Sequence, residues 1–163
     1  MRLFRPFIFL LALPLAFFAA CNRGAHPAQT GKLAPDFTVS DGFTTVHLAS
    51  YRGRPVLLNF WWSQCAPCIE EIPSLLQLHH EMPNLVILAV SIDDDPDSYA
   101  RFIVRRHVDL ITVRDPAQSA PRLFHTDMWP ETYAIDQNGY IQRKFVGAQD
   151  WSSPEIRYFL KNL

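Results

Sequence analysis

Residues 55–80, PVLLNFWWSQCAPCIEEIPSLLQLHH, join a continuous apolar run to a helical pattern through a pair of cysteines. The run from Pro55 to Trp61 has the length of a strand, and its continuous rather than alternating apolar pattern, in which Asn59 is the one polar residue, favours a central strand that is buried on both faces. From Cys65 to His80, apolar side chains recur every three or four residues, which predicts a helix. The apolar positions of this helix are Ile69, Ile72, Leu75, Leu76 and His79.

Further strands and helices alternate along the chain on both sides of this stretch. Strands are expected at 35–39, 44–48, 85–92, 110–113, 132–136 and 140–146, and helices at 96–107, at 119–124 and after Ser153. Asp41-Gly42 and Gln137-Asn138-Gly139 are turn signals between paired strands. Ser153 followed by Pro154 predicts a capped helix start. This order predicts one α/β domain with a mixed, mainly parallel central sheet that helices cover on both sides.

The two cysteines lie where the central strand gives way to a helix. Cys65 is expected at the helix N-terminus, where unpaired backbone N–H groups and the helix dipole stabilise a thiolate and make it the attacking sulfur. Cys68 lies one turn further on the same face and can form a disulfide with Cys65. A bridge across so short a loop constrains the unfolded chain little, so we expect redox chemistry from this pair.

Three other roles compete for the cysteine pair. A zinc site needs four ligands, and His79 and His80 are more than two helical turns away from the motif. Two thiolates can hold copper(I), which leaves a copper-binding, metallochaperone-like module as the alternative function. A peroxidase on the same fold would need a Thr-x-x-Cys arrangement, but Ser63 lies only two residues before Cys65.

Two polar clusters elsewhere are better explained by exposed structure than by a site. His125 and Asp127 are expected in a surface loop. Asp93 to Asp95 are expected at a solvated helix start, because no further oxygen ligands with the spacing of a cation loop follow them. We therefore expect no metal site and no cofactor beyond the redox-active disulfide.

The first twenty residues have the order of a secretory signal, with basic residues before an uncharged apolar segment that ends in small residues. Cys21 directly after two alanines predicts a lipoprotein signal at 1–20, a lipidated Cys21 with a flexible tether at 21–33, and a folded domain at 34–163. An uncleaved signal anchor and a simple secreted form are the alternatives, although the apolar run is short for a membrane span. All three forms place the domain outside the cytoplasm, on the periplasmic side of the cell envelope. The formal net charge of −1 and the lack of a basic stripe argue against a nucleic-acid partner.

The motif resembles a known family. Asn59-Phe60-Trp61, Cys65-Ala66-Pro67-Cys68 and Glu71-Ile72-Pro73 are similar to the TlpA/ResA/CcmG-like thioredoxin family, and the likeness extends from Ala34 to the final helix. The resemblance implies a thioredoxin fold with a central mixed sheet flanked by helices, an N-terminal β-hairpin and an extra βα insertion. It also implies an extracytoplasmic thiol-disulfide oxidoreductase that is anchored to the membrane.

The resemblance extends to residues outside the cysteine motif. Trp129-Pro130-Glu131-Thr132 resembles the family's cis-proline segment, which implies that Pro130 is cis beside the disulfide and that Trp129 offers its backbone to a substrate. The same segment resembles the branch that reduces apocytochrome c. Glu71 is implied to be buried near the cysteines, with a raised pKa that lets it exchange a proton with Cys68. Periodicity alone favours a solvated helix residue like Glu70, and only the resemblance favours a functional Glu71.

The expected function is reduction of protein disulfides by attack of Cys65 and resolution by Cys68. The substrate is expected to be apocytochrome c or the cysteine pair of a metal site, and a membrane thiol donor is expected to regenerate the dithiol. Gln64, Trp62 and Trp129 depart from the family pattern around the disulfide and leave the partner's identity open. Trp62 is either part of a substrate-docking surface or part of the core.

Overall fold

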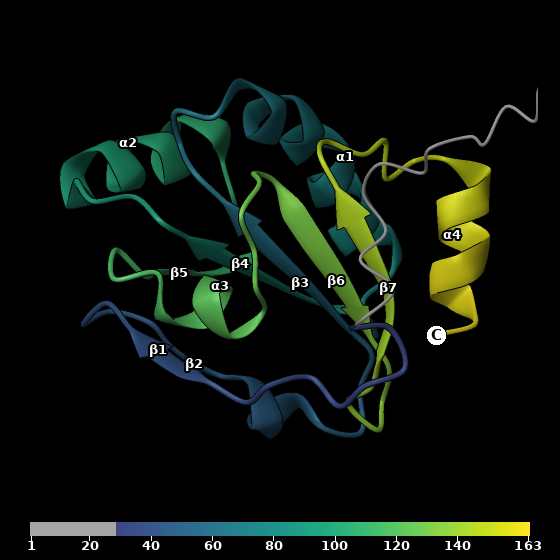
Figure 1. The fold of residues 1–163 in the computed structure, drawn as a ribbon. Helices are drawn as coiled ribbons and strands as arrows, with labels where there is room; N and C mark the ends of the chain where they lie inside the picture. Colours follow the sequence, from purple (N-terminus) through teal and green to yellow (C-terminus); the bar gives the residue numbers. More distant parts are fainter. Residues whose placement is uncertain (1–28) are drawn as a thin grey trace, which may run out of the picture.

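The computed structural model describes residues 29–163, so the predicted signal at 1–20 and the predicted lipidation site Cys21 lie outside the described residues. A five-stranded mixed sheet forms the centre of the domain (Figure 1). Its strands lie in the order β5 (Ile111–Arg114), β4 (Val86–Ser91), β3 (Val56–Trp61), β6 (Glu131–Ile135) and β7 (Ile141–Val146). β3, β4 and β5 are parallel, whereas β6 and β7 are antiparallel to their neighbours. The predicted central strand therefore occupies the middle of the sheet.

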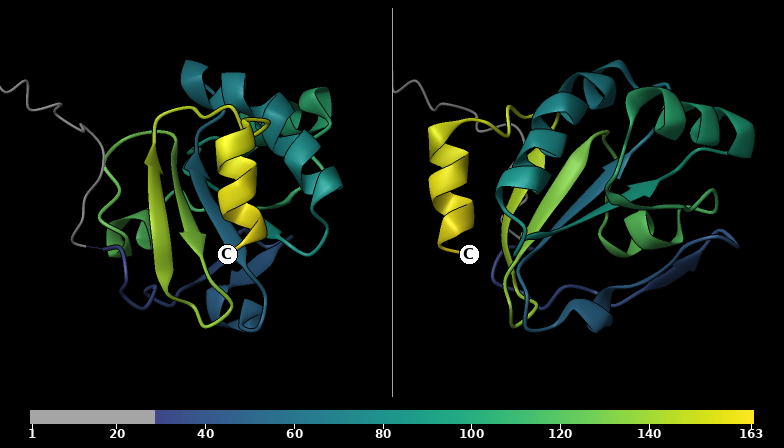
Figure 2. Two further views of the ribbon diagram at one scale, coloured as in Figure 1. Left: turned by 90° about the vertical axis from the view of Figure 1, so that its right-hand side faces the viewer. Right: turned by 180° about the vertical axis from the view of Figure 1, so that it is seen from behind.

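Helices and a separate hairpin cover the two faces of this sheet (Figure 2). One face carries α1 (Ala66–Glu81), α2 (Pro96–Arg106) and α4 (Pro154–Lys161). The other face carries α3 (Ser119–Leu123) and the hairpin of β1 (Thr38–Ser40) and β2 (Thr45–His47), which a 3-10 turn at Leu48–Tyr51 follows. β5 and α3 form the expected βα insertion between α2 and β6. The thioredoxin fold and the expected order of elements are confirmed, with element ends shifted by a few residues.

The burial of every residue of β3, including the polar Asn59, follows from these two covers. Leu58 and Phe60 enter the apolar cluster beneath the hairpin and α3, whereas Leu57 and Trp61 enter the cluster beneath the other three helices. Successive side chains of a strand point to opposite faces, and in β3 both faces are buried. A polar residue at any of these positions would need its own buried partner.

Three local features differ from expectation. Ser153 is the N-cap residue of α4, but its side chain makes no capping hydrogen bond. Leu78 is fully buried and His79 only half-buried, because Leu78 shares the inward face of α1 with Cys68, Glu71 and Leu75.

The third difference concerns the predicted tether. The N–H of Gly31 donates to the carbonyl of Ile141 at 2.7 Å, and the N–H of Ile141 donates to the carbonyl of Lys32 at 2.9 Å. The end of the tether is thus fixed against β7 before residue 34. Within residues 29–163, no helix combines the length and the apolarity that a membrane crossing requires.

Candidate functional site

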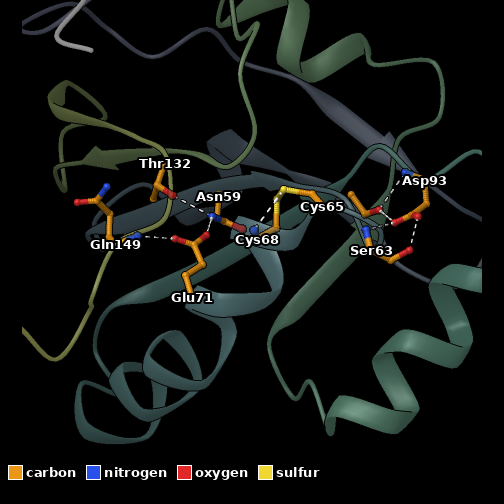
Figure 3. Close-up of a disulfide and its surroundings, with 9 residues drawn as sticks. Asn59, Ser63, Cys65, Cys68, Glu71, Asp93, Thr132 and Gln149 are labelled. Atoms are coloured by element: carbon orange, nitrogen blue, oxygen red, sulfur yellow. Dashed lines mark hydrogen bonds between the residues drawn. A yellow bond between two sulfur atoms is a disulfide. The ribbon is translucent and has the colours of Figure 1, made fainter. Parts of the chain in front are cut away.

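The cysteine pair lies at the junction of β3 and α1, as predicted. Cys65 is the N-cap residue of α1, and its sulfur accepts a hydrogen bond from the backbone N–H of Cys68 at 3.2 Å. The two residues form a disulfide (Figure 3). Cys68 is buried, whereas Cys65 is partly exposed. Cys65 is therefore the cysteine that a partner can reach, and its sulfur sits at a helix N-terminus, where backbone N–H groups and the helix dipole favour a thiolate.

The Trp129–Pro130 peptide bond is cis, as the family resemblance implied. Pro130 immediately precedes β6, whose first residue, Glu131, pairs with Phe60 of β3. The proline therefore lies at the same end of the sheet as the cysteine loop. Pro130 is buried and Trp129 is half-buried, and Trp129 packs against both apolar clusters.

Glu71 is buried on the inward face of α1, one turn beyond Cys68. Its carboxylate accepts hydrogen bonds from the Asn59 amide at 2.8 Å, the Gln149 backbone N–H at 3.2 Å and the Trp151 indole at 3.2 Å. Burial raises the pKa of Glu71 to about 7, although these three donors favour the ionised form. The alternative of a solvated Glu71 is wrong, and only its neighbour Glu70 is exposed.

A second buried carboxylate, Asp93, lies on the other side of the disulfide (Figure 3). It accepts hydrogen bonds from the backbone N–H of Ser63 at 3.0 Å and from the Ser63 hydroxyl at 2.5 Å. The hydroxyl of Ser91, at the end of β4, donates to the same carboxylate at 2.5 Å. We call these three residues the Asp93 clamp, because they tie the loop before Cys65 to β4.

The Asp93 clamp corrects the expectation of a solvated helix start at Asp93 to Asp95. Asp94 is exposed, and Asp95 caps α2 by accepting from the N–H groups of Asp97 and Ser98. Asp93, in contrast, is 1% exposed. The signal that could have found it is the alternation Ser91-Ile92-Asp93 at the end of a buried strand, which puts two polar side chains on one side.

A buried ion pair that sequence analysis missed follows the cis-proline directly. Lys144 Nζ lies 2.9 Å from Glu131 Oε1, and both side chains are almost fully buried. The Tyr133 hydroxyl donates to Glu131 Oε2 at 3.0 Å. Burial raises the pKa of the Tyr133 phenol, which therefore stays a neutral donor. This network fixes the start of β6 and the end of β7 beside Pro130.

The tryptophans of the motif separate into two environments. Trp61 is 1% exposed and packs against Tyr99 and Phe102 of α2, so it belongs to the core. Trp62 is 36% exposed and remains available to a partner beside Cys65. His125 and Asp127 are exposed in the loop before β6, as expected. Among residues 29–163, no cluster of three or more His, Cys, Asp or Glu side chains is arranged to hold a metal ion.

Comparisons with known proteins agree with this geometry. The model of the AhpC/TSA family matches residues 30–144. The chain is 28% identical over 159 residues to the thiol-disulfide oxidoreductase ResA of Geobacillus thermodenitrificans, which covers 96% of this chain and 90% of the relative. It is 32% identical over 120 residues to the ResA of Geobacillus kaustophilus, which covers 72% of this chain and 69% of the relative. A solved Chlorobium tepidum structure, assigned as the thiol:disulfide interchange protein DsbE, has a TM-score of 0.72 at 27% identity and covers 82% of this chain and 93% of that one.

Proposed function

We propose that this chain reduces protein disulfides outside the cytoplasm. It belongs to the AhpC/TSA family and, within that family, to the TlpA/ResA/CcmG-like thiol-disulfide oxidoreductases. The protein is a thioredoxin-like disulfide oxidoreductase. Our proposal covers the direction of electron flow, the compartment, the substrate and the roles of individual residues. The observation that carries it is the position of Cys65, a partly exposed N-cap sulfur that accepts the N–H of Cys68.

The reaction starts from the dithiol form of the protein. Cys65 first loses its proton to solvent. The Cys65 thiolate then attacks one sulfur of the substrate disulfide, so that a mixed disulfide forms and one substrate thiolate leaves. Cys68 loses its proton and attacks Cys65, which releases the second substrate sulfur. The substrate gains two electrons and two protons, and the protein loses the same number and closes the Cys65–Cys68 disulfide. The dithiol of Cys65 and Cys68 itself carries the two electrons, without a cofactor.

Glu71 is the proton acceptor for Cys68 in this proposal. A pKa of about 7 means that a large share of Glu71 is ionised near neutral pH, and a base is most effective when its pKa lies near the working pH. Glu71 lies on the same buried face of α1 as Cys68, one turn away. It passes the proton to the departing substrate thiolate or to solvent, which restores the base for the next cycle.

The partner is held beside the disulfide. The exposed Trp62 and the backbone of Trp129, next to Pro130, form the proposed surface for an extended substrate segment. The Pro130-Glu131-Thr132 sequence favours an apocytochrome c cysteine pair as the substrate, with the cysteines of a metal site as the second class. Regeneration requires a membrane thiol donor, and lipidation of Cys21 would keep the domain near it.

Removal of the attacking sulfur tests the assignment. The purified full chain with Cys65→Ser should no longer accelerate the reduction of insulin disulfides by dithiothreitol, because the remaining Cys68 is buried. Cys68→Ser should accumulate a mixed disulfide with the substrate, which non-reducing electrophoresis detects. Cys21→Ser is the matched control, because it removes a cysteine outside the proposed centre. Insulin reduction by Cys65→Ser at the wild-type rate would contradict the proposed function.

A further inference from the structure

A hollow of about 290 Å³ lies beside the cysteine pair, between the loop before Cys65 and helix α2. The loop contributes Ser63 and Gln64 to its wall. The opposite wall is basic and contains Arg101, Arg105 and Arg106 of α2. We call these three residues the arginine wall.

The arginine wall is made by one side of an amphipathic helix. Arg101 and Arg105 are four residues apart and so lie on the same face of α2. Phe102, which also lines the hollow, packs against Trp61 and fixes the helix to the domain. The basic groups are therefore held at the rim of the site by the core and do not depend on a flexible loop.

Most of the positive charge of the arginine wall is free to meet a partner. Arg101 lies 3.6 Å from Asp95, with which it forms an exposed ion pair. Arg105 and Arg106 are exposed and form no salt bridge with any residue between 29 and 163. All 16 acidic residues of the chain lie in this described part, whereas Arg2, Arg5 and Arg23 lie before it. A basic cluster on a domain with an acidic excess is a local feature that total charge does not predict.

The opposite side of the disulfide carries the opposite charge. A second hollow, of about 350 Å³, is lined by Glu70, Glu71 and Asp150. In Figure 3 the disulfide lies between Glu71 on one side and the loop residue Ser63 on the other. A substrate segment that crosses the cysteine pair therefore meets acidic groups on one side and arginines on the other.

We propose that the arginine wall is a docking surface for an acidic segment that flanks the target cysteines of the protein substrate. This inference rests on the proposed function and adds the charge of the partner to it. Exposed charges at the rim of an interface act chiefly on the rate of encounter and on the choice of partner, and salt screens them. The arginines therefore select acidic substrates without taking part in the thiol exchange.

The ordinary explanation of Arg105 and Arg106 is their place in the last turn of α2, where basic side chains stabilise the helix dipole. That role affects the stability of the helix and does not depend on the charge of a substrate. A comparison of substrates that differ only in charge therefore separates the two explanations.

The experiment measures reduction of disulfide-closed Cys-Ala-Ala-Cys peptides by the purified, reduced full chain. The peptides carry glutamates, glutamines or lysines on both flanks. We expect the second-order rate constant of reduction to be about tenfold higher for the glutamate peptide than for the glutamine peptide at low ionic strength. The lysine peptide should be the slowest, and the differences should largely disappear at about 0.5 M sodium chloride, where the Debye length is only a few Å.

Matched arginine variants assign the effect to the arginine wall. The double variant Arg105→Gln, Arg106→Gln should lose most of the preference for the glutamate peptide and keep the wild-type rate with the glutamine peptide. Arg122→Gln, on α3 at the other face of the sheet, should keep the preference. Circular dichroism checks that α2 is intact, and the charge-reversed variant Arg105→Glu should favour the lysine peptide.

Several outcomes would overturn the inference. Equal rates for all peptides with the wild-type chain would show that the arginine wall does not select substrates by their charge. The proposed reductase function would remain intact. An acidic preference that survives in the double variant would place the selecting charge elsewhere. Equal peptide rates together with arginine-dependent sedimentation with anionic phospholipid vesicles would assign the wall to a membrane surface. Failure of the wild-type chain to reduce any peptide would instead overturn the proposed function itself.

Discussion

At the scale of the residue, burial gives Glu71, a common helix glutamate, the raised pKa that the proposed proton transfer from Cys68 requires. Three hydrogen-bond donors hold the carboxylate, yet desolvation dominates and raises its pKa to about 7. Below this pH the side chain is neutral and cannot accept the proton of Cys68. Above it, the carboxylate can act as a base. The rate of the Cys68 step should therefore rise with pH through about 7.

Glu71→Gln tests this behaviour. Reduced protein is mixed with the aromatic disulfide 5,5′-dithiobis(2-nitrobenzoate), and the second, slower release of thiolate reports attack of Cys68 on the mixed disulfide. At pH 8 we expect this phase to slow by about 100-fold, the lower end of the usual range for general base catalysis. The inflection near pH 7 should disappear. Glu70→Gln, one residue away but exposed, is the control and should behave as wild type. An unchanged second phase in Glu71→Gln would exclude Glu71 as the base.

Some residues around the disulfide could be predicted from the sequence and others could not. The C-x-x-C spacing predicted that Cys65 and Cys68 can form a disulfide at a helix start, because both features depend on neighbouring residues. The cis form of Pro130 and the burial of Glu71 came from the family resemblance and agree with the structure. The only local signal for the burial of Asp93 is the alternation Ser91-Ile92-Asp93, and it does not name the partner that Asp93 needs on another element. Its partner Ser63 is thirty residues away, on a different element, and three consecutive aspartates indicate an exposed turn.

At the scale of the element, the Asp93 clamp holds the loop that carries Cys65 against the end of β4. Asp93→Asn replaces one acceptor oxygen with a donor, so at least one of the hydrogen bonds from Ser63 and Ser91 must be lost or rearranged. A buried polar group without its partner costs about 1–3 kcal/mol. We expect urea unfolding to show a loss of stability in this range. Asp94→Asn should stay within about 0.5 kcal/mol of wild type, because Asp94 is exposed.

A positioning role for the Asp93 clamp predicts more than lost stability. Loosening of the loop should lower kcat/KM for disulfide reduction at a temperature where the variant is fully folded, because the Cys65 sulfur is then less well placed on the N-terminus of α1. If the Asp93→Asn protein is destabilised but folded and has the wild-type kcat/KM, the Asp93 clamp stabilises the fold and does not position Cys65.

The order of elements was predictable because each one has a local signature. The apolar run of β3, the three-to-four spacing of α1 and the Asp41-Gly42 turn all arise from neighbouring residues. The pairing of β6 with β3, and not with β4 or β5, depends on contacts between residues more than seventy positions apart. The same holds for the fixing of Gly31 to Ile141. Sequence patterns give no register for such long-range partners, which is why the predicted tether extended too far.

At the scale of the whole molecule, the charges around the disulfide determine which redox state the fold favours. Buried Glu71 and Asp93 lie on either side of the cysteine pair (Figure 3), and negative charge nearby disfavours a thiolate. The N-terminus of α1 and the arginine wall act in the opposite direction, but the arginines are exposed and screened. Destabilising the reduced form makes a stronger reductant, whereas strong oxidants of this fold owe their potential to a stabilised reduced form.

We therefore predict a reduction potential near or below about −250 mV, close to that of thioredoxin, when the full chain is equilibrated with dithiothreitol. Glu71→Gln removes the negative charge that Glu71 carries above about pH 7, so at such pH it should raise the potential by up to about 30 mV, which is a tenfold change in the equilibrium constant. Glu70→Gln should leave it unchanged, because an exposed carboxylate is screened by solvent. A wild-type potential of about −120 to −180 mV would indicate an oxidant or isomerase. In that case electrons would flow from substrate thiols to the protein, and an apocytochrome c disulfide could not be its substrate.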